Sequence, residues 1–467
     1  MTNFLKKYIG DKQFYKTVLA ISVPIMIQNG ITNLLSLVDN IMVGQLSTEA
    51  MSGVSIVNQF IFIFNLLVFG AVSAASIFTS QFFGKGDVVG IRNTFRLKII
   101  MNVIASALGV ICFLVFKNQL IGLFLHDGTE GDLTLTLNYG IDYLMVMLIG
   151  LLPYSLTQAY SSTMRETGDN LTPMLSSVIA VVSNCLLNAV FIFGLLGFPA
   201  LGVKGAGLAT VISRFIELLI VALKTHLTPK KYPFIVGSYR SLIIPKELTK
   251  QVILKGFPLI LNEFLWALAM TLRNQCYSTR GLDVVASLNI MTTLFNVFNV
   301  IYKALGRTTA IIIGSKLGAN EIDGAICDAD KLIFFSVLVT VGISIIFALS
   351  SLFFPYLYNV SDEIRVLARN MMIISSLSMP FSAYVNSTYF AMRSGGKIGI
   401  TFIFDSGFMW IVVMPLSFIL SYLTPLSIIP LFALCQSTDV LKALFGATLY
   451  SKKTWAKTLV NDEKLSA

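Results

Sequence analysis

An acidic side chain, Asp39, lies inside the first long apolar segment of the chain, 15 residues after Pro24. At that distance along a helix, its carboxyl group is expected in the outer half of a membrane. An unpaired carboxylate there costs several kcal/mol, so it must be protonated, paired with a positive group or bound to a cation. These are the states between which an ion-coupling site switches. The alternative is a structural carboxylate that is hydrogen-bonded to helix ends.

Two amides in a later apolar segment, Asn184 and Asn188, are four residues apart and therefore share one face of a helix. Neutral amide oxygens suit a hard cation such as Na⁺. The alternative is hydrogen bonding between helices, which is common for asparagine in membrane bundles. In the first two segments, Gln28, Asn33 and Gln59 are expected to line a cleft that receives a substrate.

The elements that position these residues are predicted to be membrane-spanning helices. The chain has 467 residues, of which 55% are hydrophobic and 12% charged, against about 25% charged in an ordinary soluble domain. Its mean hydropathy is +0.78. Segments long enough to cross a bilayer are expected at 16–40, 52–80, 94–116, 133–158, 173–195, 204–226, 252–275, 283–313, 330–352, 364–390, 398–420 and 426–449.

Two stretches of the chain are related by an internal duplication. The segment 24–90 aligns without a gap on 258–324 at a constant offset of 234 residues, with Pro24 on Pro258 and Gly84 on Gly318. Two related sets of six spans in the same orientation are typical of a membrane transporter.

The charges predict an orientation with both termini in the cytoplasm. When residues toward the ends of the expected spans are counted with the adjacent side, 25 of the 34 lysines and arginines lie on the inner side and only five on the outer side. The remaining four, Arg214, Arg273, Lys303 and Arg307, lie inside the expected spans. This asymmetry explains the net charge of +10 without a nucleic-acid partner. Residues 229–251 are expected to form a cytoplasmic linker between an N-terminal lobe (1–228) and a C-terminal lobe (252–467), and its end, from Pro245, to form a short helix on the inner surface.

Several motifs occur in an order and spacing that resemble the multidrug and toxic compound extrusion (MATE) family of secondary transporters. The resemblance covers nearly the whole chain, and the motifs that carry it are Val38-Asp39 with Gly44, Gln81-x-x-Gly84-x-x-Asp87, Arg165-x-x-Gly168-Asp169-x-x-Thr172-Pro173, Asn184-x-x-x-Asn188-x-x-Phe191 and Gly205-x-Gly207-x-Ala209-Thr210.

The resemblance implies an all-α, polytopic fold of twelve transmembrane helices in two pseudo-symmetric six-helix bundles arranged as a V. It also implies that Asp39 couples transport to a cation and that Thr210 supplies a hydroxyl at the same site. Asn184 and Asn188 would complete that site, and Asp39, Asn184 and Asn188 would ligate Na⁺ if Na⁺ is the coupling ion. Some family members carry a second acid where this chain has Asn188, so the choice between Na⁺ and H⁺ stays open.

The second lobe departs from the first, because Arg273 occupies the position equivalent to Asp39. Glu263, in the seventh span, resembles an acid that couples protons in some branches of the family, and Asp405 lies in the eleventh span. Both are candidates for coupling or substrate binding. For Asp405, an ion pair with Arg273, Lys303 or Arg307 is the preferred interpretation.

The expected function is antiport, in which Na⁺ or H⁺ enters while organic, cationic or amphipathic compounds leave across the cytoplasmic membrane. The alternative is a flippase for lipids or lipid-linked oligosaccharides with a related two-lobe architecture. We expect a monomer in the lipid bilayer that is not an enzyme and binds no cofactor besides the coupling ion. The sequence contains no phosphate-binding lysine motif, so ATP is not expected to be the direct energy source. The physiological substrate stays open.

Overall fold

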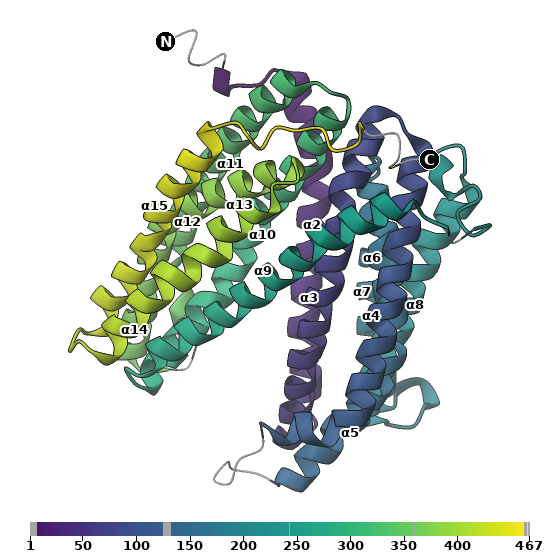
Figure 1. The fold of residues 1–467 in the computed structure, drawn as a ribbon. Coiled ribbons are helices and arrows are strands. Elements are labelled where there is room, and N and C mark those ends of the chain that lie inside the picture. Colours follow the sequence, from purple (N-terminus) through teal and green to yellow (C-terminus); the bar gives the residue numbers. More distant parts are fainter. Residues whose placement is uncertain (1–6, 125–131, 242, 359, 462–464, 466–467) are drawn as a thin grey trace. The chain divides into compact units, whose positions relative to one another are not determined.

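The computed structural model describes residues 7–124, 132–241, 243–358, 360–461 and 465 (Figure 1). The terminal residues 1–6 and 466–467 of the two expected lobes therefore lie outside the described residues. The first half contains α2 (Lys12–Gly44), α3 (Thr48–Lys85), α4 (Val88–Gly122), α5 (Leu133–Ile149), α6 (Leu151–Glu166), α7 (Leu171–Phe193), η1 (Leu195–Gly197) and α8 (Gly202–Leu227). The second half contains η2 (Pro233–Ile235), α9 (Lys246–Ser278), α10 (Leu282–Gly318), α11 (Ile322–Ser350), η3 (Phe354–Leu357), α12 (Asp362–Ser394), α13 (Ile398–Phe402), η4 (Ile403–Gly407), η5 (Met409–Val413), α14 (Met414–Tyr422) and α15 (Ile428–Ser451).

The described residues form helices long and apolar enough to cross a membrane. Nine helical stretches meet this criterion singly, and α5 with α6 makes a tenth span that is bent by 45°. The helices α2 and α12, of 33 residues each, complete the twelve segments expected from the sequence. The predicted all-α polytopic class is confirmed.

The bend between α5 and α6 has a local cause in the sequence. Pro153 is the third residue of α6, where it can donate no hydrogen bond to the preceding turn and its ring crowds that turn. The carbonyl of Gly150, at the junction, accepts a hydrogen bond from Arg214 Nη1 on α8 at 3.2 Å. The fourth span is therefore two helices rather than the single one that its hydropathy suggests.

The chain divides into two compact units that are not continuous in sequence. Unit 1 contains 1–26, 80–86 and 257–462, and unit 2 contains 27–79, 87–256 and 463–467. Three helices, α2, α3 and α9, thus begin in one unit and end in the other. Residues 1–26 and 80–86 belong by sequence to the first half but pack in the unit that holds most of the second half. The lobes expected from the sequence stay a prediction about which parts move together.

Each unit has its own apolar core. In unit 2 the core lies among α3, α4 and α5 and includes Val57, Phe60, Leu144 and Met147. In unit 1 one core lies among α10, α11, α12 and α15, with Phe347, Met371, Met379 and Leu431 at its centre.

The expected linker is docked on unit 2. Arg96 of α4 donates to the carbonyls of Ser238 at 2.8 Å and Gly237 at 2.7 Å, and the rings of Phe95 and Phe234 lie 5.3 Å apart. The separate surface helix expected from Pro245 is wrong. Residues from Lys246 onward are the first turns of α9, which continues through Pro258, because no helix-ending signal interrupts them.

Candidate functional site

Asp39 lies on α2 and meets the two asparagines of α7. Asn188 Nδ2 donates to Asp39 Oδ1 at 2.6 Å and to Asn184 Oδ1 at 3.0 Å. Asn184 Nδ2 in turn contacts Thr210 Oγ1 on α8 at 3.2 Å. The structure thus joins, within unit 2, the four side chains that the sequence suggested for one site.

The donor set of this cluster suits a cation or a proton. Asn184 and Asn188 are 1% and 0% exposed, and the buried Oδ1 of Asn188 has no hydrogen-bond partner in the described part of the chain. If the Asn184 amide is turned over, its nitrogen donates to Asp39 Oδ1 at 2.9 Å and its oxygen accepts from Thr210. The Asn184 amide can therefore present either its oxygen or its N–H to the centre of the cluster. Oxygen atoms of this kind are the ligands that a hard cation prefers.

Gln28 takes part in a second polar chain of unit 2. Its Nε2 donates to Ser177 Oγ at 2.8 Å, and its Oε1 accepts from Arg165 Nη2 at 3.0 Å. Ser177 Oγ donates to Glu217 on α8. Gln28 therefore connects α2 with α6, α7 and α8. By contrast, the other two polar candidates, Asn33 on α2 and Gln59 on α3, are exposed.

In unit 1, Asp405 has a different partner from those expected. Lys442 Nζ of α15 lies 2.6 Å from Asp405 Oδ1, and Asn262 Nδ2 of α9 donates to Asp405 Oδ2 at 2.9 Å. The pair is largely buried, with the Lys442 side chain 8% exposed. Because Asp405 lies in the π-helical turn η4, its placement depends on a wider turn that the sequence does not announce.

Glu263 follows Asn262 on α9 and is half-buried. Within the described residues it makes no hydrogen bond or ion pair, although Arg393, Arg307 and Lys303 lie close enough to act on it electrostatically. Arg273, almost three turns further along α9, has a buried Nε without a hydrogen-bond partner in the part of the chain described. The structure therefore does not join Glu263, Arg273 and Asp405 into one hydrogen-bonded cluster.

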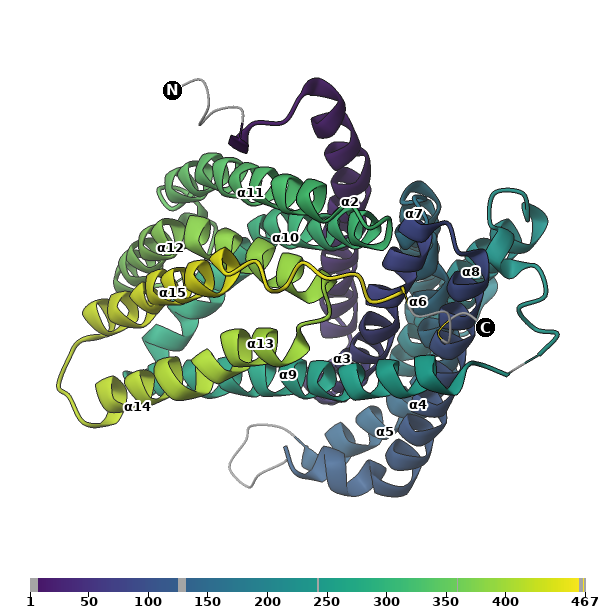
Figure 2. The ribbon, with the colours of Figure 1, turned by 45° about the horizontal axis from the view of Figure 1, so that its top comes forward.

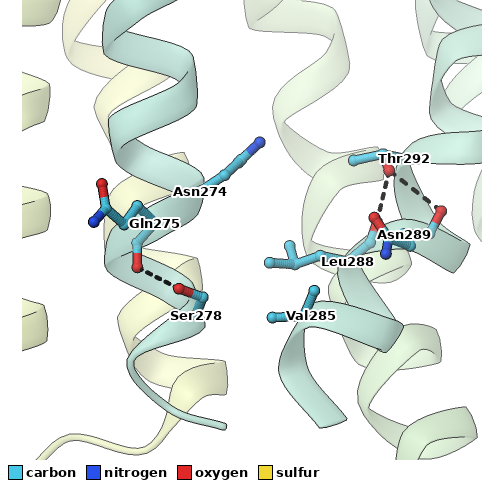
Figure 3. Close-up of a pocket in the computed structure, with 7 residues that line it drawn as sticks. All are labelled: Asn274, Gln275, Ser278, Val285, Leu288, Asn289 and Thr292. Carbon is cyan, nitrogen blue, oxygen red and sulfur yellow. Dashed lines mark hydrogen bonds between the residues drawn. The ribbon is translucent and has the colours of Figure 1, made fainter. Parts of the chain in front are cut away.

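A pocket of about 290 Å³ lies between α9 and α10 in unit 1 (Figure 3). Its lining has hydrogen-bonding but uncharged side chains beside two aliphatic ones: Asn274, Gln275, Ser278, Val285, Leu288, Asn289 and Thr292. Asn274 points from α9 toward α10 (Figure 3). Such a lining can accept an uncharged polar group of a ligand. This pocket was not predicted from the sequence.

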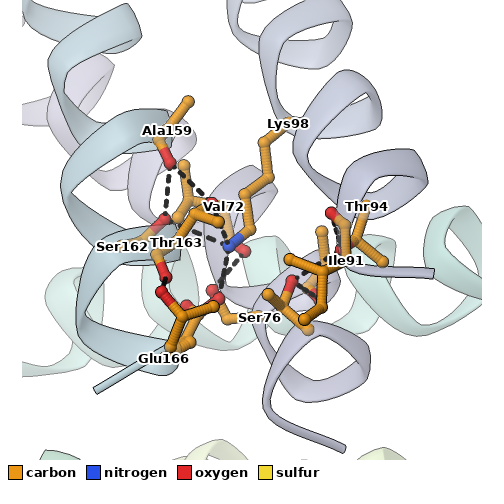
Figure 4. Close-up of polar contacts among 12 residues, drawn as sticks. Val72, Ser76, Ile91, Thr94, Lys98, Ala159, Ser162, Thr163 and Glu166 are labelled. Carbon is orange, nitrogen blue, oxygen red and sulfur yellow. Dashed lines mark hydrogen bonds and ion pairs between the residues drawn. The ribbon is translucent and has the colours of Figure 1, made fainter. Parts of the chain in front are cut away.

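A buried ion pair of unit 2 also escaped the sequence analysis. Lys98 of α4 is 0% exposed, and its Nζ lies 2.5 Å from Glu166 Oε2 and within 3.2 Å of the hydroxyls of Ser162 and Thr163, all on α6 (Figure 4). The charge count placed Lys98 at the inner membrane surface. The burial of Lys98 could not be predicted, because a lysine near the end of a span looks the same in sequence whether its side chain reaches water or a buried acid.

Asp169, in the loop after α6, fastens the linker to unit 2. Its carboxylate accepts from Lys231 Nζ at 2.7 Å, from the Tyr232 hydroxyl and from Thr172 Oγ1 at 2.7 Å. Burial alone would raise the pKa of Asp169, but the hydrogen bonds from Lys231, Tyr232 and Thr172 outweigh it and lower that pKa to about 2. The motif of this loop, which contributes to the resemblance to the MATE family, thus has a structural role in holding the linker on unit 2.

Comparisons with known proteins agree with this architecture. The chain is 28% identical over 273 residues to a probable multidrug resistance protein NorM of Thermotoga maritima, a match that covers 57% of this chain and 56% of that relative. It is 24% identical over 423 residues to the probable multidrug resistance protein YoeA of Bacillus subtilis, with 87% of each chain covered.

A solved structure shares the fold. A transporter of the MOP superfamily from Pyrococcus furiosus, described by its investigators as having a binding pocket of reversed polarity, superimposes with a TM-score of 0.83. That match covers 96% of this chain and 98% of the other at 19% identity. The family model named MatE matches residues 24–190 and 258–423, which contain the two duplicated segments. The chain is therefore a multi-pass membrane transporter and belongs to the MatE family, the multidrug and toxic compound extrusion transporters.

Proposed function

We propose that this protein is an antiporter that couples the entry of Na⁺ or H⁺ to the export of organic compounds by alternating access. The observation that carries the proposal is the contact of Asp39 with Asn188, whose buried Oδ1 has no hydrogen-bond partner among the described residues. A carboxylate and a neighbouring free amide oxygen can both serve as ligands of a cation. A proton on Asp39 could instead donate to that oxygen.

Binding at this site would act on α2. When Asp39 is ionised and empty, the N–H groups of Asn188 stabilise its charge. When Na⁺ binds, the amide oxygens must turn inward, and the contact between α2 and α7 changes. Because α2 passes from unit 1 into unit 2, a change of its packing bears on both units. An ion that binds one arrangement more tightly than the other shifts the equilibrium between them.

The proposed energy source is the ion gradient. One charge moving down a membrane potential releases about 2.3 kcal/mol per 100 mV. Glu263 is the second acid that we propose for coupling or substrate binding, because Asp405 is already neutralised by Lys442. Both termini are proposed to be cytoplasmic, and a monomer in the lipid bilayer is proposed as the working unit.

The proposed substrates are amphipathic and cationic compounds. The names of the two relatives, which are multidrug resistance proteins, support this choice. The uncharged pocket between α9 and α10 offers such compounds hydrogen bonds. Their positive charge would require an acid, for which Asp39 and Glu263 are the candidates.

The test is efflux of ethidium from proteoliposomes under an imposed Na⁺ gradient and, separately, a pH gradient. We expect Asp39→Asn to abolish gradient-driven efflux while the variant inserts and folds. The matched control is Asp142→Asn, whose carboxylate is 43% exposed and paired with Lys204 at 3.2 Å. Normal efflux by well-folded Asp39→Asn would contradict the coupling role. If wild-type protein moves no ethidium but translocates labelled lipids, the flippase alternative gains instead.

A further inference from the structure

The ends of α3 and α10 cross with almost no space between their backbones. A Cβ atom added at Gly84 would lie 1.7 Å from the Ser315 carbonyl oxygen, and one added at Gly318 would lie 1.8 Å from that of Gln81. These two contacts are related by the duplication, since the offset of 234 places Gln81 on Ser315 and Gly84 on Gly318. Only glycine lets the helices approach this closely. The crossing lies at the ends that the charge distribution assigns to the cytoplasm.

The segment that follows α15 lies over this crossing. We call residues 452–461 the C-terminal strap; Figure 2 shows it in yellow, running on from α15 as irregular chain with turns at its start. Its Trp455 and Val460 are 1% and 0% exposed. The Trp455 carbonyl fits against Gly395, where an added Cβ would lie 1.6 Å away. The strap is therefore packed into unit 1 and is not a loose tail.

Gln81 is the side chain that fastens the strap to α3. It is 0% exposed. Its Oε1 accepts from the Leu459 N–H at 2.6 Å, and its Nε2 donates to the carbonyls of Lys457 at 3.3 Å and Ser394 at 2.8 Å. One buried amide thus holds two residues of the strap and the last residue of α12.

Two further contacts place the strap on both helices of the crossing. Lys85 Nζ, at the end of α3, donates to the Val460 carbonyl at 2.8 Å. Thr458 Oγ1 donates to the Leu317 carbonyl at 2.6 Å and contacts Asn320 Oδ1 at 3.2 Å, at the end of α10. The strap therefore bridges α3 and α10 rather than resting on one of them.

The strap contacts the end of α3 that belongs to unit 1. Residues 80–86 of α3 belong to unit 1, while the rest of that helix belongs to unit 2. In the alternating access proposed above, opening at this end would separate α3 from α10. Separation would leave the buried amide of Gln81 and its three backbone partners without hydrogen bonds, which is unfavourable.

We propose that Gln81 and Lys85 are positioning residues of the transport cycle, which hold the C-terminal strap across the crossing of α3 and α10 and keep it closed until the strap is released. This rests on the alternating access proposed above, but not on the identity of the ion or of the substrate. Strap release would then limit how often the site opens at this end.

The test compares Gln81→Met with wild type by hydrogen–deuterium exchange and by transport. Methionine keeps the length of the side chain but removes three hydrogen bonds. We expect exchange in 80–86 and 315–320 to accelerate on the order of tenfold or more, since the three lost hydrogen bonds oppose local opening in the wild type. Thr458→Val, which alters the strap itself, should accelerate exchange in the same peptides. Gln119→Met, at an exposed glutamine of α4, is the matched control and should leave both peptides unchanged.

The outcomes distinguish a strap that keeps the crossing closed from a contact that only stabilises the fold. If the strap keeps the crossing closed, exchange at the helix ends becomes faster in the variants and efflux changes, including ion leak without substrate. If exchange rises only in 455–460 while 80–86 and 315–320 stay protected and efflux is normal, the proposed role of the strap is overturned. If wild-type protein shows no efflux, the proposed function fails, whereas the exchange result still decides whether the strap holds the crossing closed.

Discussion

At the scale of single residues, unit 2 offers two ion pairs in opposite surroundings. Lys98 and Glu166 are 0% and 6% exposed, while Lys204 and Asp142 are 57% and 43% exposed. Removing one partner of a buried pair leaves an uncompensated charge. We therefore expect Lys98→Met to lower the free energy of unfolding by about 3–5 kcal/mol. Lys204→Met should lower it by at most about 1 kcal/mol. Thermal unfolding of the purified variants in detergent measures the difference.

The double variant Lys98→Met/Glu166→Gln sharpens this prediction. It removes both charges, so most of the lost stability should return. Equal unfolding temperatures for Lys98→Met and Lys204→Met would show that Glu166 does not need its partner, and would contradict the importance of the pair.

The loop carboxylate Asp169 predicts a dependence of stability on pH. Hydrogen bonds from Lys231, Tyr232 and Thr172 lower the pKa of Asp169 to about 2 in spite of its burial, against 3.8 for an ordinary aspartate. Its contribution to stability is therefore complete above pH 3.8 and disappears as the pH falls toward 2. Unfolding curves at pH 7, 4 and 3 should show a decline below pH 4 that is shallower in Asp169→Asn. The variant should also be less stable at pH 7. Identical unfolding curves for the two proteins would show that the Asp169 carboxylate does not stabilise the fold.

Residue types singled out Asp39, Asn184 and Asn188, because charged and amide groups are rare and costly in apolar spans. The resemblance to the MATE family added Thr210 to the same site. The partners of lysines were not predictable in the same way. Lys442 pairs with Asp405 and Lys98 with Glu166. Both lysines lie in segments where a long side chain reaches the membrane surface as easily as a buried acid.

At the scale of elements, the close packing of α7 on α8 depends on Gly205. A Cβ atom there would lie 2.4 Å from the Phe191 carbonyl oxygen, which belongs to the backbone and cannot rotate away. Gly205→Ala must therefore push the helices apart, at a cost of about 1–3 kcal/mol. Thr210 would move from Asn184 with α8. We expect a lower unfolding temperature together with weaker ion-dependent efflux.

Gly342 of α11 provides the control. An added Cβ there meets nothing within 4 Å, so Gly342→Ala should leave both stability and efflux near wild type. If Gly205→Ala behaves in the same way, the approach of α7 and α8 is looser than the structure indicates.

The helices were predictable in number and class, but their breaks were not. Hydropathy treats 133–158 as one span, whereas contacts of Gly150 and Arg214 accompany a bend there. Conversely, the polar start of α9 runs on as helix from Lys246 to Ser278. Helix ends inside apolar or mixed segments depend on packing partners that are distant in sequence.

At the scale of the whole molecule, the charge distribution predicts which loops face the cytoplasm. Lys230 lies in the linker and is exposed, and Leu196, between α7 and α8, is 87% exposed. We expect a membrane-impermeant maleimide to label Leu196→Cys in intact cells and Lys230→Cys only after permeabilisation. A parallel sample of wild-type protein corrects for the exposed native Cys112. The reverse pattern would invert the orientation.

Two boundaries between the units lie next to prolines that are equivalent in the duplication. Pro24 lies inside α2 and Pro258 inside α9 at equivalent positions of the duplicated segments. The boundary between the units falls just after Met26 in α2 and just before Phe257 in α9. Since a proline removes one backbone hydrogen bond and crowds the preceding turn, a helix bends there at little further cost. A motion of one unit against the other therefore acts on α2 and α9 next to these prolines, and on α3 at residues 79–80.

Pro258→Ala tests whether that bending limits transport. Alanine restores the missing hydrogen bond, so the variant should unfold at a higher temperature than wild type, while its efflux slows severalfold because α9 resists bending. Pro430→Ala is the matched control, because Pro430 lies in the first turn of α15, after the extended Ser427, where a proline disturbs no helical hydrogen bond. Higher stability with undiminished efflux in Pro258→Ala would place the moving joint elsewhere. Slow efflux without added stability would point to a packing defect, since only a stiffened helix changes both quantities in opposite directions.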